Sequence, residues 1–208
     1  HYYPDLLPHL SSCKSPHQMT GALIKTWFAE KNQLDPKNIV VVSVMPCTAK
    51  KFEATREDEN GAGADIPDVD IVITTRELAR LIQMAQLNFQ RLPDEKFDDA
   101  MGIRTGAGVI FGATGGVMEA ALRTAADTLE GKSIENIEYH EVRGTKDLKE
   151  ATYKIAGMDV KVAVVSGLKN ANELLAKIRG GEADYHFIEI MCCPGGCVNG
   201  GGQPIQPA

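Results

Sequence analysis

Two runs of β-branched residues, the second of which leads into a helical segment, constrain the fold of this chain more than any other feature. The first run is Ile39–Val44, and the strand that it predicts ends at Pro46. The second run, Val69–Thr74, leads directly into a helical pattern. Continuous β-branched runs are typical of strands covered on both faces, so both runs are predicted as buried strands. Because such strands alternate with helices, we expect an α/β fold with mostly parallel sheets flanked by helices.

The remaining elements follow from apolar periodicity and from cap and turn residues. Helices are expected at 16–31, 75–85 with Thr75 as the cap, 112–129 and 170–178. Strands are expected at 38–45, 69–74, 137–142, 152–155, 160–165 and 185–191, with 156–159 closing a hairpin. Residues 87–105 are expected to form a solvated excursion.

Composition and charge exclude several classes of protein. The formal net charge is −6 over 208 residues, and basic residues are concentrated nowhere, so no nucleic-acid partner is expected. The longest apolar run, Ile39–Met45, is far shorter than the roughly 20 residues that cross a bilayer. We therefore expect no membrane span and a cytoplasmic location, with the periplasm and organelles left open.

The cysteines are odd in number and unevenly spaced: Cys13, Cys47, Cys192, Cys193 and Cys197. Adjacent cysteines are poor disulfide partners, so a metal or cluster site is the more natural expectation. Two sulfurs on the turn between Cys193 and Cys197 suit two corners of an iron–sulfur cluster, because glycines let backbone N–H groups approach the thiolates. The alternative is a glycine-rich surface loop whose cysteines are incidental.

Cys47 lies just after the first predicted strand, with Lys50 three residues further on. A cation at that spacing stabilises a thiolate, so Cys47 is a candidate nucleophile or metal ligand, with a buried structural cysteine as the alternative. Glu189 lies two residues before Met191 on a predicted strand. From the pattern alone, Glu189 points either into a site or at a partner cation.

The glycine segment Gly106–Val117 gives a rival hypothesis, a dinucleotide-binding turn. Against this interpretation, the strand before the turn would be only about three residues long, and no acidic residue follows where a ribose partner should lie. Glycines that let a helix start lie against a bulky group or a neighbouring backbone explain the segment better.

Two motifs carry a resemblance to a known family. Met45–Glu53 (MPCTAKKFE) and Glu189–Pro204 (EIMCCPGGCVNGGGQP) resemble the second and third signature sequences of iron-only (FeFe) hydrogenases. The segments Leu10–Pro16, Thr74–Ala79 and Phe111–Arg123 are similar to the same family's catalytic domain. The resemblance extends along the whole chain, which is identified as part of an FeFe-hydrogenase catalytic domain, with the cluster site at strand ends between two lobes.

The resemblance implies a cofactor and roles for named residues. The cofactor is the H-cluster, a 4Fe-4S cubane joined through a cysteine sulfur to a diiron unit with carbon monoxide, cyanide and a bridging dithiolate amine. Cys47 and Cys193 would bind the cubane, and Cys197 would bridge it to the diiron unit. Lys50 would hydrogen-bond a cyanide. The remaining implied residues are Met45 and Met191 beside the diiron unit, Pro46, Phe111 and Gly196 against the cofactor, Glu53 as support, and Ser11 on the proton route.

The chain also departs from the family's pattern. The first signature, Thr-Ser-Cys-Cys-Pro, is absent, so we expect residues 1–208 to be a partial domain that lacks the fourth cluster ligand and is inactive when made alone. Cys192 stands where the family usually has alanine, which leaves Cys192 and Cys193 as alternative ligands, although spacing favours Cys193.

The expected activity of the parent protein is reversible reduction of protons to hydrogen, with electrons from a ferredoxin or another redox carrier and with hydrogenase maturation proteins as further partners. The alternative is a non-catalytic iron–sulfur cluster assembly or scaffold relative. A nicotinamide-dependent enzyme built on the glycine segment is the third interpretation.

Overall fold

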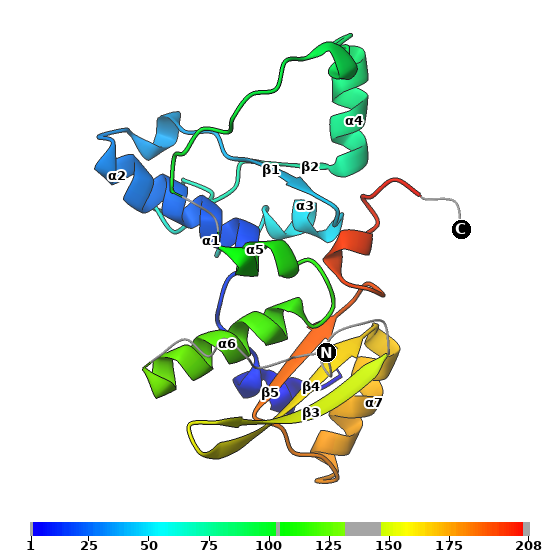
Figure 1. The fold of residues 1–208 in the computed structure, drawn as a ribbon. Helices are drawn as coiled ribbons and strands as arrows, with labels where there is room; N and C mark the ends of the chain where they lie inside the picture. Colours follow the sequence, from blue (N-terminus) through cyan, green and yellow to red (C-terminus); the bar gives the residue numbers. More distant parts are fainter. Residues whose placement is uncertain (1, 103–104, 132–146, 206–208) are drawn as a thin grey trace. The chain divides into compact units, whose positions relative to one another are not determined.

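The computed structural model describes residues 2–102, 105–131 and 147–205, which form two compact units. Unit 1 comprises residues 1–103 and 201–208, and unit 2 comprises residues 104–200 (Figure 1). The α/β class is confirmed, since two of the three strand pairings among these residues are parallel. The strand predicted at 137–142 lies outside the described residues. In the described part of the chain, every helix is too short or too polar to cross a bilayer.

Unit 1 begins with the 3-10 turn η1 (Pro4–His9) and a helix that covers residues 16–31, as predicted. This helix is divided by a wide turn into α1 (Pro16–Leu23), η2 (Ile24–Phe28) and α2 (Ala29–Lys31). The other elements of unit 1 are η3 (Pro36–Asn38), β1 (Val42–Met45), α3 (Ala49–Glu53), β2 (Ile71–Thr74), α4 (Thr75–Met84) and η4 (Phe89–Arg91).

The two strands of unit 1 pair in parallel, from Val42 opposite Ile71 to Met45 opposite Thr74. The first strand is shorter than predicted, because the backbone N–H of Val41 binds the Asp70 carboxylate. The prediction that both strands are buried on both faces is wrong for the described residues, since Val42 and Ile71 are 50% and 48% exposed. Among the described residues each strand pairs only with the other, and side chains on one face of the pair, such as Val42 and Ile71, stay about half exposed.

Helix α4 starts from a cap one residue earlier than the sequence predicts. Thr74, not Thr75, is the cap, and its hydroxyl accepts a hydrogen bond from Glu77 N–H at 3.2 Å. The Glu77 carboxylate accepts in return from Thr74 N–H at 2.8 Å, which completes a capping box. The cap therefore fixes the point where β2 turns into α4.

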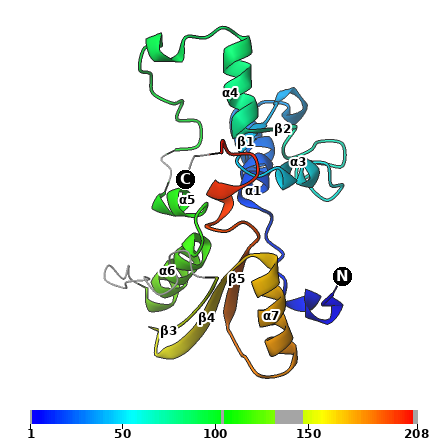
Figure 2. The same ribbon diagram turned by 90° about the vertical axis from the view of Figure 1, so that its right-hand side faces the viewer.

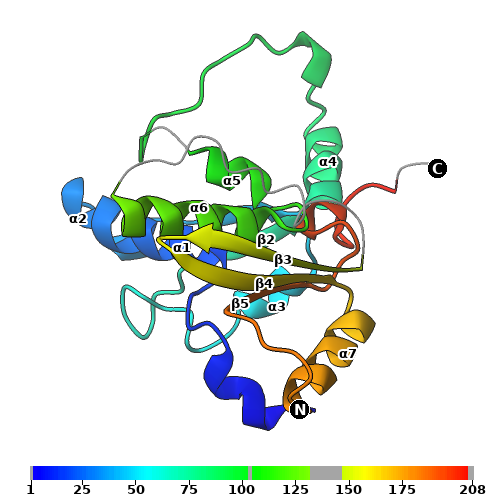
Figure 3. The same cartoon turned by 60° about the horizontal axis from the view of Figure 1, so that its bottom comes forward.

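In the described part of unit 2, three strands form a sheet in the order β3, β4, β5, with a helix on each face (Figure 2). Its elements are α5 (Gly106–Ile110), α6 (Gly116–Glu130), β3 (Leu148–Ile155), β4 (Met158–Ser166), α7 (Leu168–Arg179), β5 (Phe187–Met191) and η6 (Cys197–Asn199). The predicted hairpin is confirmed, with Ala156 and Gly157 at its tip in left-handed conformations. Strand β5 pairs in parallel with β4, as Figure 3 shows.

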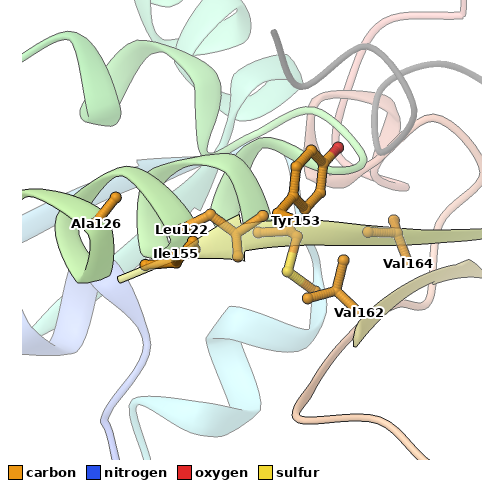
Figure 4. Close-up of a cluster of buried hydrophobic side chains, with 7 residues drawn as sticks. Leu122, Ala126, Tyr153, Ile155, Val162 and Val164 are labelled. Atoms are coloured by element: carbon orange, nitrogen blue, oxygen red, sulfur yellow. The ribbon is translucent and has the colours of Figure 1, made fainter. Parts of the chain in front are cut away.

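Alternate residues of the central strand β4 face the two helices. Val162 and Val164 lie in a cluster with Met118, Leu122 and Ala126 of α6 and Tyr153 and Ile155 of β3 (Figure 4). Ala163 and Val165 pack on the other face against Ala171 and Leu174 of α7. Fully burying one such side chain contributes about 1.5–3 kcal/mol, so these clusters hold the strand that leads into the cysteine turn.

The segment 106–116 corrects the predicted start of a helix. Residues 106–110 form helix α5, and α6 starts at Gly116, four residues later than predicted. A Cβ on Gly116 would lie 1.8 Å from the carbonyl oxygen of Ile110, so only glycine lets the chain turn from α5 into α6 there. The segment is helix, turn and helix, which removes the strand that a dinucleotide-binding turn requires.

Candidate metal centre

Cys47 follows the carboxyl end of β1, as predicted, and is half-buried. The end of β1 is covered by a glycine run from the last residues of the chain. Gly202 N–H donates to the Pro46 carbonyl at 2.7 Å, and the Gly202 carbonyl accepts from Arg76 N–H at 3.1 Å. A Cβ on Gly202 would lie 2.8 Å from both Pro46 O and the Thr74 side chain. Glycine is therefore required for this close approach over the strand ends.

Lys50 and Glu53 lie on α3, directly after Cys47, and form an ion pair. The Lys50 ammonium is 2.9 Å from Oε1 and 2.8 Å from Oε2 of Glu53. Both side chains are about one-fifth exposed, at 18% and 20%. The structure thus brings together two residues that the sequence placed at the site, and it makes Glu53 the partner of Lys50.

The Glu53 carboxylate also binds two residues that the sequence analysis missed. Ser15 Oγ donates to Oε2 at 2.7 Å, and His17 Nε2 lies 2.6 Å from the same oxygen. His17 Nδ1 is 3.0 Å from Ser43 Oγ on β1, so the network joins three elements of unit 1. Burial raises the pKa of Glu53, but the hydrogen bonds from Lys50, Ser15 and His17 outweigh it and leave that pKa below its usual value.

Ser11 is exposed, and its Oγ accepts a hydrogen bond from Cys13 N–H at 3.2 Å. This bond is local to an extended segment. Met45, the last residue of β1, is half-buried beside Pro46. In the described part of unit 1, Lys50 is thus bound to Glu53, whereas Ser11 is bound to Cys13.

The second cysteine segment is a tight turn in unit 2, after β5. Its two central glycines have left-handed backbone conformations, with φ of +81° at Gly195 and +103° at Gly196. Gly196 N–H donates to the Cys193 carbonyl at 3.0 Å, and Gly200 N–H donates to the Cys197 carbonyl at 2.9 Å. Both thiols, on Cys193 and Cys197, are half-buried, whereas the Cys192 thiol is exposed.

The cysteine turn is held against the loop that precedes α6. Thr114 N–H donates to the Gly195 carbonyl at 3.1 Å, and Val198 N–H donates to the Gly112 carbonyl at 2.9 Å. A Cβ on Gly196 would lie 2.5 Å from the Gly112 oxygen and 2.6 Å from the Thr114 nitrogen. Gly196, which the sequence analysis placed against the cofactor, must therefore be glycine, because the backbone of 112–114 leaves no room for a Cβ.

Two other predicted site residues lie at this turn. Met191, the last residue of β5, is 9% exposed, and its Sδ is 3.8 Å from Cys197 Sγ. Phe111 is half-buried and immediately precedes Gly112. Unit 2 therefore brings Met191, Gly196 and both predicted thiol ligands into one segment.

The predicted three-cysteine set draws on both units, with Cys47 in unit 1 and Cys193 and Cys197 in unit 2. No described cysteine is in a disulfide. Within either unit, the described residues contain no group of three Cys, His, Asp or Glu side chains that forms a metal site on its own. Ligation of one cluster by all three thiols stays a prediction.

Comparison with known proteins decides the family. A family described as "Iron only hydrogenase large subunit, C-terminal domain" matches residues 1–201. The chain belongs to this family. It is 52% identical over 206 residues to the periplasmic Fe hydrogenase large subunit of Nitratidesulfovibrio vulgaris, covering 99% of this chain and 48% of that protein. It is also 52% identical over 203 residues to iron hydrogenase 1 of Clostridium pasteurianum, covering 98% and 35%.

The solved structures agree with these relatives. A variant of the FeFe hydrogenase HydA1 from Chlamydomonas reinhardtii superposes with a TM-score of 0.82 at 40% identity, covering 99% of this chain and 59% of that chain. A cytosolic Fe-S cluster assembly factor of Xenopus tropicalis is also similar, at 37% identity over 202 residues, 95% of this chain and 42% of that protein. The hydrogenase-family chain described here therefore spans half or less of the curated relatives named above.

Proposed function

We propose that the protein carrying this chain catalyses the reversible reduction of protons to molecular hydrogen at an H-cluster. The observation that carries the proposal is the turn that presents Cys193 and Cys197, in which the two central glycines have backbone conformations that other residues rarely adopt. A second thiol, that of Cys47, supports the proposal, because the ion pair between Lys50 and Glu53 follows it directly in the sequence.

The residues fit the cofactor that the family implies. Thiolates are the ligands that iron–sulfur clusters take, and three thiols are available at the ends of strands β1 and β5. The space beside Gly196 has no room for a Cβ, so that turn is bounded by backbone N–H and C=O groups. When bound, the H-cluster supplies electrons, one at a time from the cubane, and an open metal position.

Each thiol has a proposed role. Cys47 and Cys193 hold the cubane, and Cys197 holds the cubane and the diiron unit together. The half-buried Cys193 is a better candidate than the exposed Cys192, because a ligand needs a protected position. Met191 contacts Cys197 and presents an apolar surface at the site, which excludes water.

Lys50 is proposed to donate a hydrogen bond to a cyanide of the diiron unit. Its ammonium has three N–H donors, and the Glu53 carboxylate accepts at both oxygens. Glu53 therefore orients the Lys50 head group, while Ser15 and His17 hold Glu53 in place. Met45, Pro46 and Phe111 are proposed as apolar neighbours of the cofactor, and Ser11 as part of the proton route.

The partners are proposed from the same activity. A ferredoxin or another redox carrier would exchange electrons with the protein, and hydrogenase maturation proteins would deliver the diiron unit. The cytoplasmic location stays a prediction, since one relative is named a periplasmic enzyme.

The test is anaerobic production of the full-length protein together with hydrogenase maturation proteins. Alanine variants of Cys47, Cys193 and Cys197 are each expected to lose iron and hydrogen production, whereas Cys13→Ala and Cys192→Ala keep both. Infrared bands of metal-bound carbon monoxide and cyanide report the diiron unit independently of activity. Full iron content and normal bands in any of the first three variants would remove that cysteine from the ligand set.

A second candidate function is iron–sulfur cluster assembly, which the similarity to the Xenopus tropicalis factor favours. The same preparation separates the two. An assembly factor would bind iron and sulfide without carbon monoxide and cyanide bands and without producing hydrogen. We propose further that the 208 residues expressed alone are inactive, because they contain no Thr-Ser-Cys-Cys-Pro segment.

A further inference from the structure

The carboxylate of Glu189 is buried in unit 2, on strand β5, two residues before the strand ends. It is 6% exposed, and its two oxygens accept hydrogen bonds from two backbone groups of α6. Oε1 accepts from Gly115 N–H and Oε2 from Met118 N–H, each at 2.7 Å. The strand that delivers the cysteine turn is thus bound directly to the start of a helix more than 70 residues earlier in the chain.

Helix α6 needs this carboxylate, because its own cap residue has no side chain. The cap is Gly115, with φ of +83°. The two N–H groups bound by Glu189 are those of the cap and of the third helical residue, Met118, which a capping box satisfies from within the helix. In α4, Thr74 and Glu77 share that task locally, whereas in α6 a single residue of β5 performs both parts.

The same bonds complete a closed ring that contains the cysteine turn. Strand β5 leads into the turn, the turn binds Gly112 and Thr114 through two backbone hydrogen bonds, and that loop leads to Gly115. Gly115 in turn binds Glu189, which returns the path to β5. All members of the ring belong to unit 2.

We propose that Glu189 is a positioning residue, which fixes the loop 112–115 and thereby sets the Cys193 and Cys197 thiols before any metal arrives. The proposal deepens the proposed function, on which it rests for the identity of the metal group. The carboxylate binds Gly115 N–H and Met118 N–H, so it acts on the thiols through the loop that these residues end. Its negative charge at the N-terminus of α6 is stabilised by the helix dipole and by two charge-assisted hydrogen bonds.

Two substitutions separate the charge from the reach of the side chain. In Glu189→Gln, the amide oxygen replaces one acceptor, but the NH₂ group faces the second backbone N–H and leaves it without an acceptor. In Glu189→Asp, the charge is kept but the chain is one methylene shorter, so both N–H groups cannot be bound at once. Both variants are expected to release the loop, and the Gln variant more so.

The experiment is hydrogen exchange by mass spectrometry on the full-length protein, prepared without metal. Amides in peptides that cover 112–118 and 193–200 are expected to exchange at least tenfold faster in Glu189→Gln, with a smaller increase in Glu189→Asp. Amides of β3 and β4 are expected to keep their wild-type rates. Leu174→Ala, a cavity variant on the opposite face of the sheet, is the matched control, because its cluster destabilises unit 2 when truncated and includes no residue of 112–118 or 193–200.

The outcomes are decisive for the positioning role. Uniform acceleration across the whole of unit 2, with the same pattern as in Leu174→Ala, would show that Glu189 only stabilises the fold and would overturn the proposal. Unchanged exchange at 112–118 would overturn it too. If the Gln variant fails to accumulate, the Asp variant gives the same comparison.

A second readout follows loading with iron and sulfide. The electronic absorption of the cluster is expected to form several-fold more slowly in both Glu189 variants and at the wild-type rate in Leu174→Ala. If the wild-type protein binds no cluster, the proposed function fails, while the exchange pattern of the metal-free protein still tests the positioning role.

Discussion

The Lys50 ammonium lies 2.8 Å from Oε2 of Glu53, three residues further along α3, and the same oxygen is bound by Ser15 and His17. A flexible lysine is thus held by a carboxylate that is itself fixed by two other segments. Holding the head group in one orientation lowers the entropic cost of a hydrogen bond to a ligand.

The first prediction concerns that pair. Lys50→Asn is expected to abolish hydrogen production by the matured protein, because it removes the cationic donor proposed for the cyanide. Glu53→Gln keeps the lysine but weakens its orientation, and we expect a partial loss of activity. Infrared spectroscopy checks both variants, since the cyanide bands should shift in each. Bands at wild-type positions in Lys50→Asn would contradict the assignment of Lys50.

The second prediction concerns acid titration of two neighbouring ion pairs. Lys50 faces Glu53, and Lys51 faces Glu77 at 2.8 Å, where its hydrogen bond lowers the Glu77 pKa to about 2. A carboxyl whose folded pKa is depressed contributes stability above its unfolded pKa, and that contribution is lost as the pH falls through the folded value. Both pairs therefore stabilise unit 1 fully above about pH 4.5, and this effect is lost progressively as the pH falls from there through the folded pKa, which is about 2 for Glu77.

Each lysine variant is the control for the other. Lys50→Met is expected to raise the pKa of Glu53 alone, and Lys51→Met that of Glu77 alone. Carbon-13 NMR titration of the two side-chain carboxyl groups measures both values. If Lys50→Met left the Glu53 pKa where it is, Ser15 and His17 would have to supply the whole effect.

The third prediction compares alanine substitutions at two glycines, one at the cysteine turn and one in open space. Gly196 and Gly181 both have left-handed backbone angles, with φ of +103° and +74°. A Cβ on Gly196 meets the Gly112 oxygen at 2.5 Å, whereas a Cβ on Gly181 meets nothing within 4 Å. Both alanine variants carry a backbone cost of about 1–2 kcal/mol, and Gly196→Ala adds a clash.

Denaturant unfolding checks this difference. Gly181→Ala is expected to bind iron normally, and Gly196→Ala is expected to be the less stable of the two by more than 1 kcal/mol and to bind little iron. Equal stability of the two variants would mean that the loop at 112–114 moves aside without cost.

The fourth prediction concerns the buried hydroxyl of Thr114, which is 3% exposed as a residue and has no hydrogen-bond partner in the described structure. An unsatisfied buried hydroxyl costs about 1–3 kcal/mol. Thr114→Val is therefore expected to stabilise the metal-free protein by about 1 kcal/mol, and Thr114→Ser should leave the hydroxyl cost in place. Thermal unfolding of the metal-free protein measures the difference, and a destabilised valine variant would show that the hydroxyl has a partner.

Several parts of the site were predictable because they depend on short-range constraints. The turn at Gly195 and Gly196 needs left-handed backbone angles, which glycine adopts readily. Pro46 ends the strand, which places Cys47 just after it. The cap of α4 was misplaced by one residue, because Thr74 and Thr75 are chemically equivalent and only the bond to Glu77 distinguishes them.

Other parts depend on contacts between distant segments, which a single sequence does not encode locally. The partners of Glu189 lie more than 70 residues away in the sequence. The residues around a carboxylate on a strand do not indicate which helix it caps. The helix at 106–110 was not predicted because its apolar residues are few, and the turn at Gly116 is a tertiary requirement. Val42 and Ile71 are about half exposed although they are β-branched and apolar. Their burial depends on what packs against the sheet, which the residue types of the two strands do not determine.

The hydrogen bond from Gly202 to Pro46 joins the last described segment to the first strand of unit 1, although all of unit 2 lies between them in the chain. During synthesis, unit 1 starts first but cannot close over the end of β1 until the ribosome has released residue 202. Closure of unit 1 over β1 therefore depends on a segment that is translated only after the whole of unit 2.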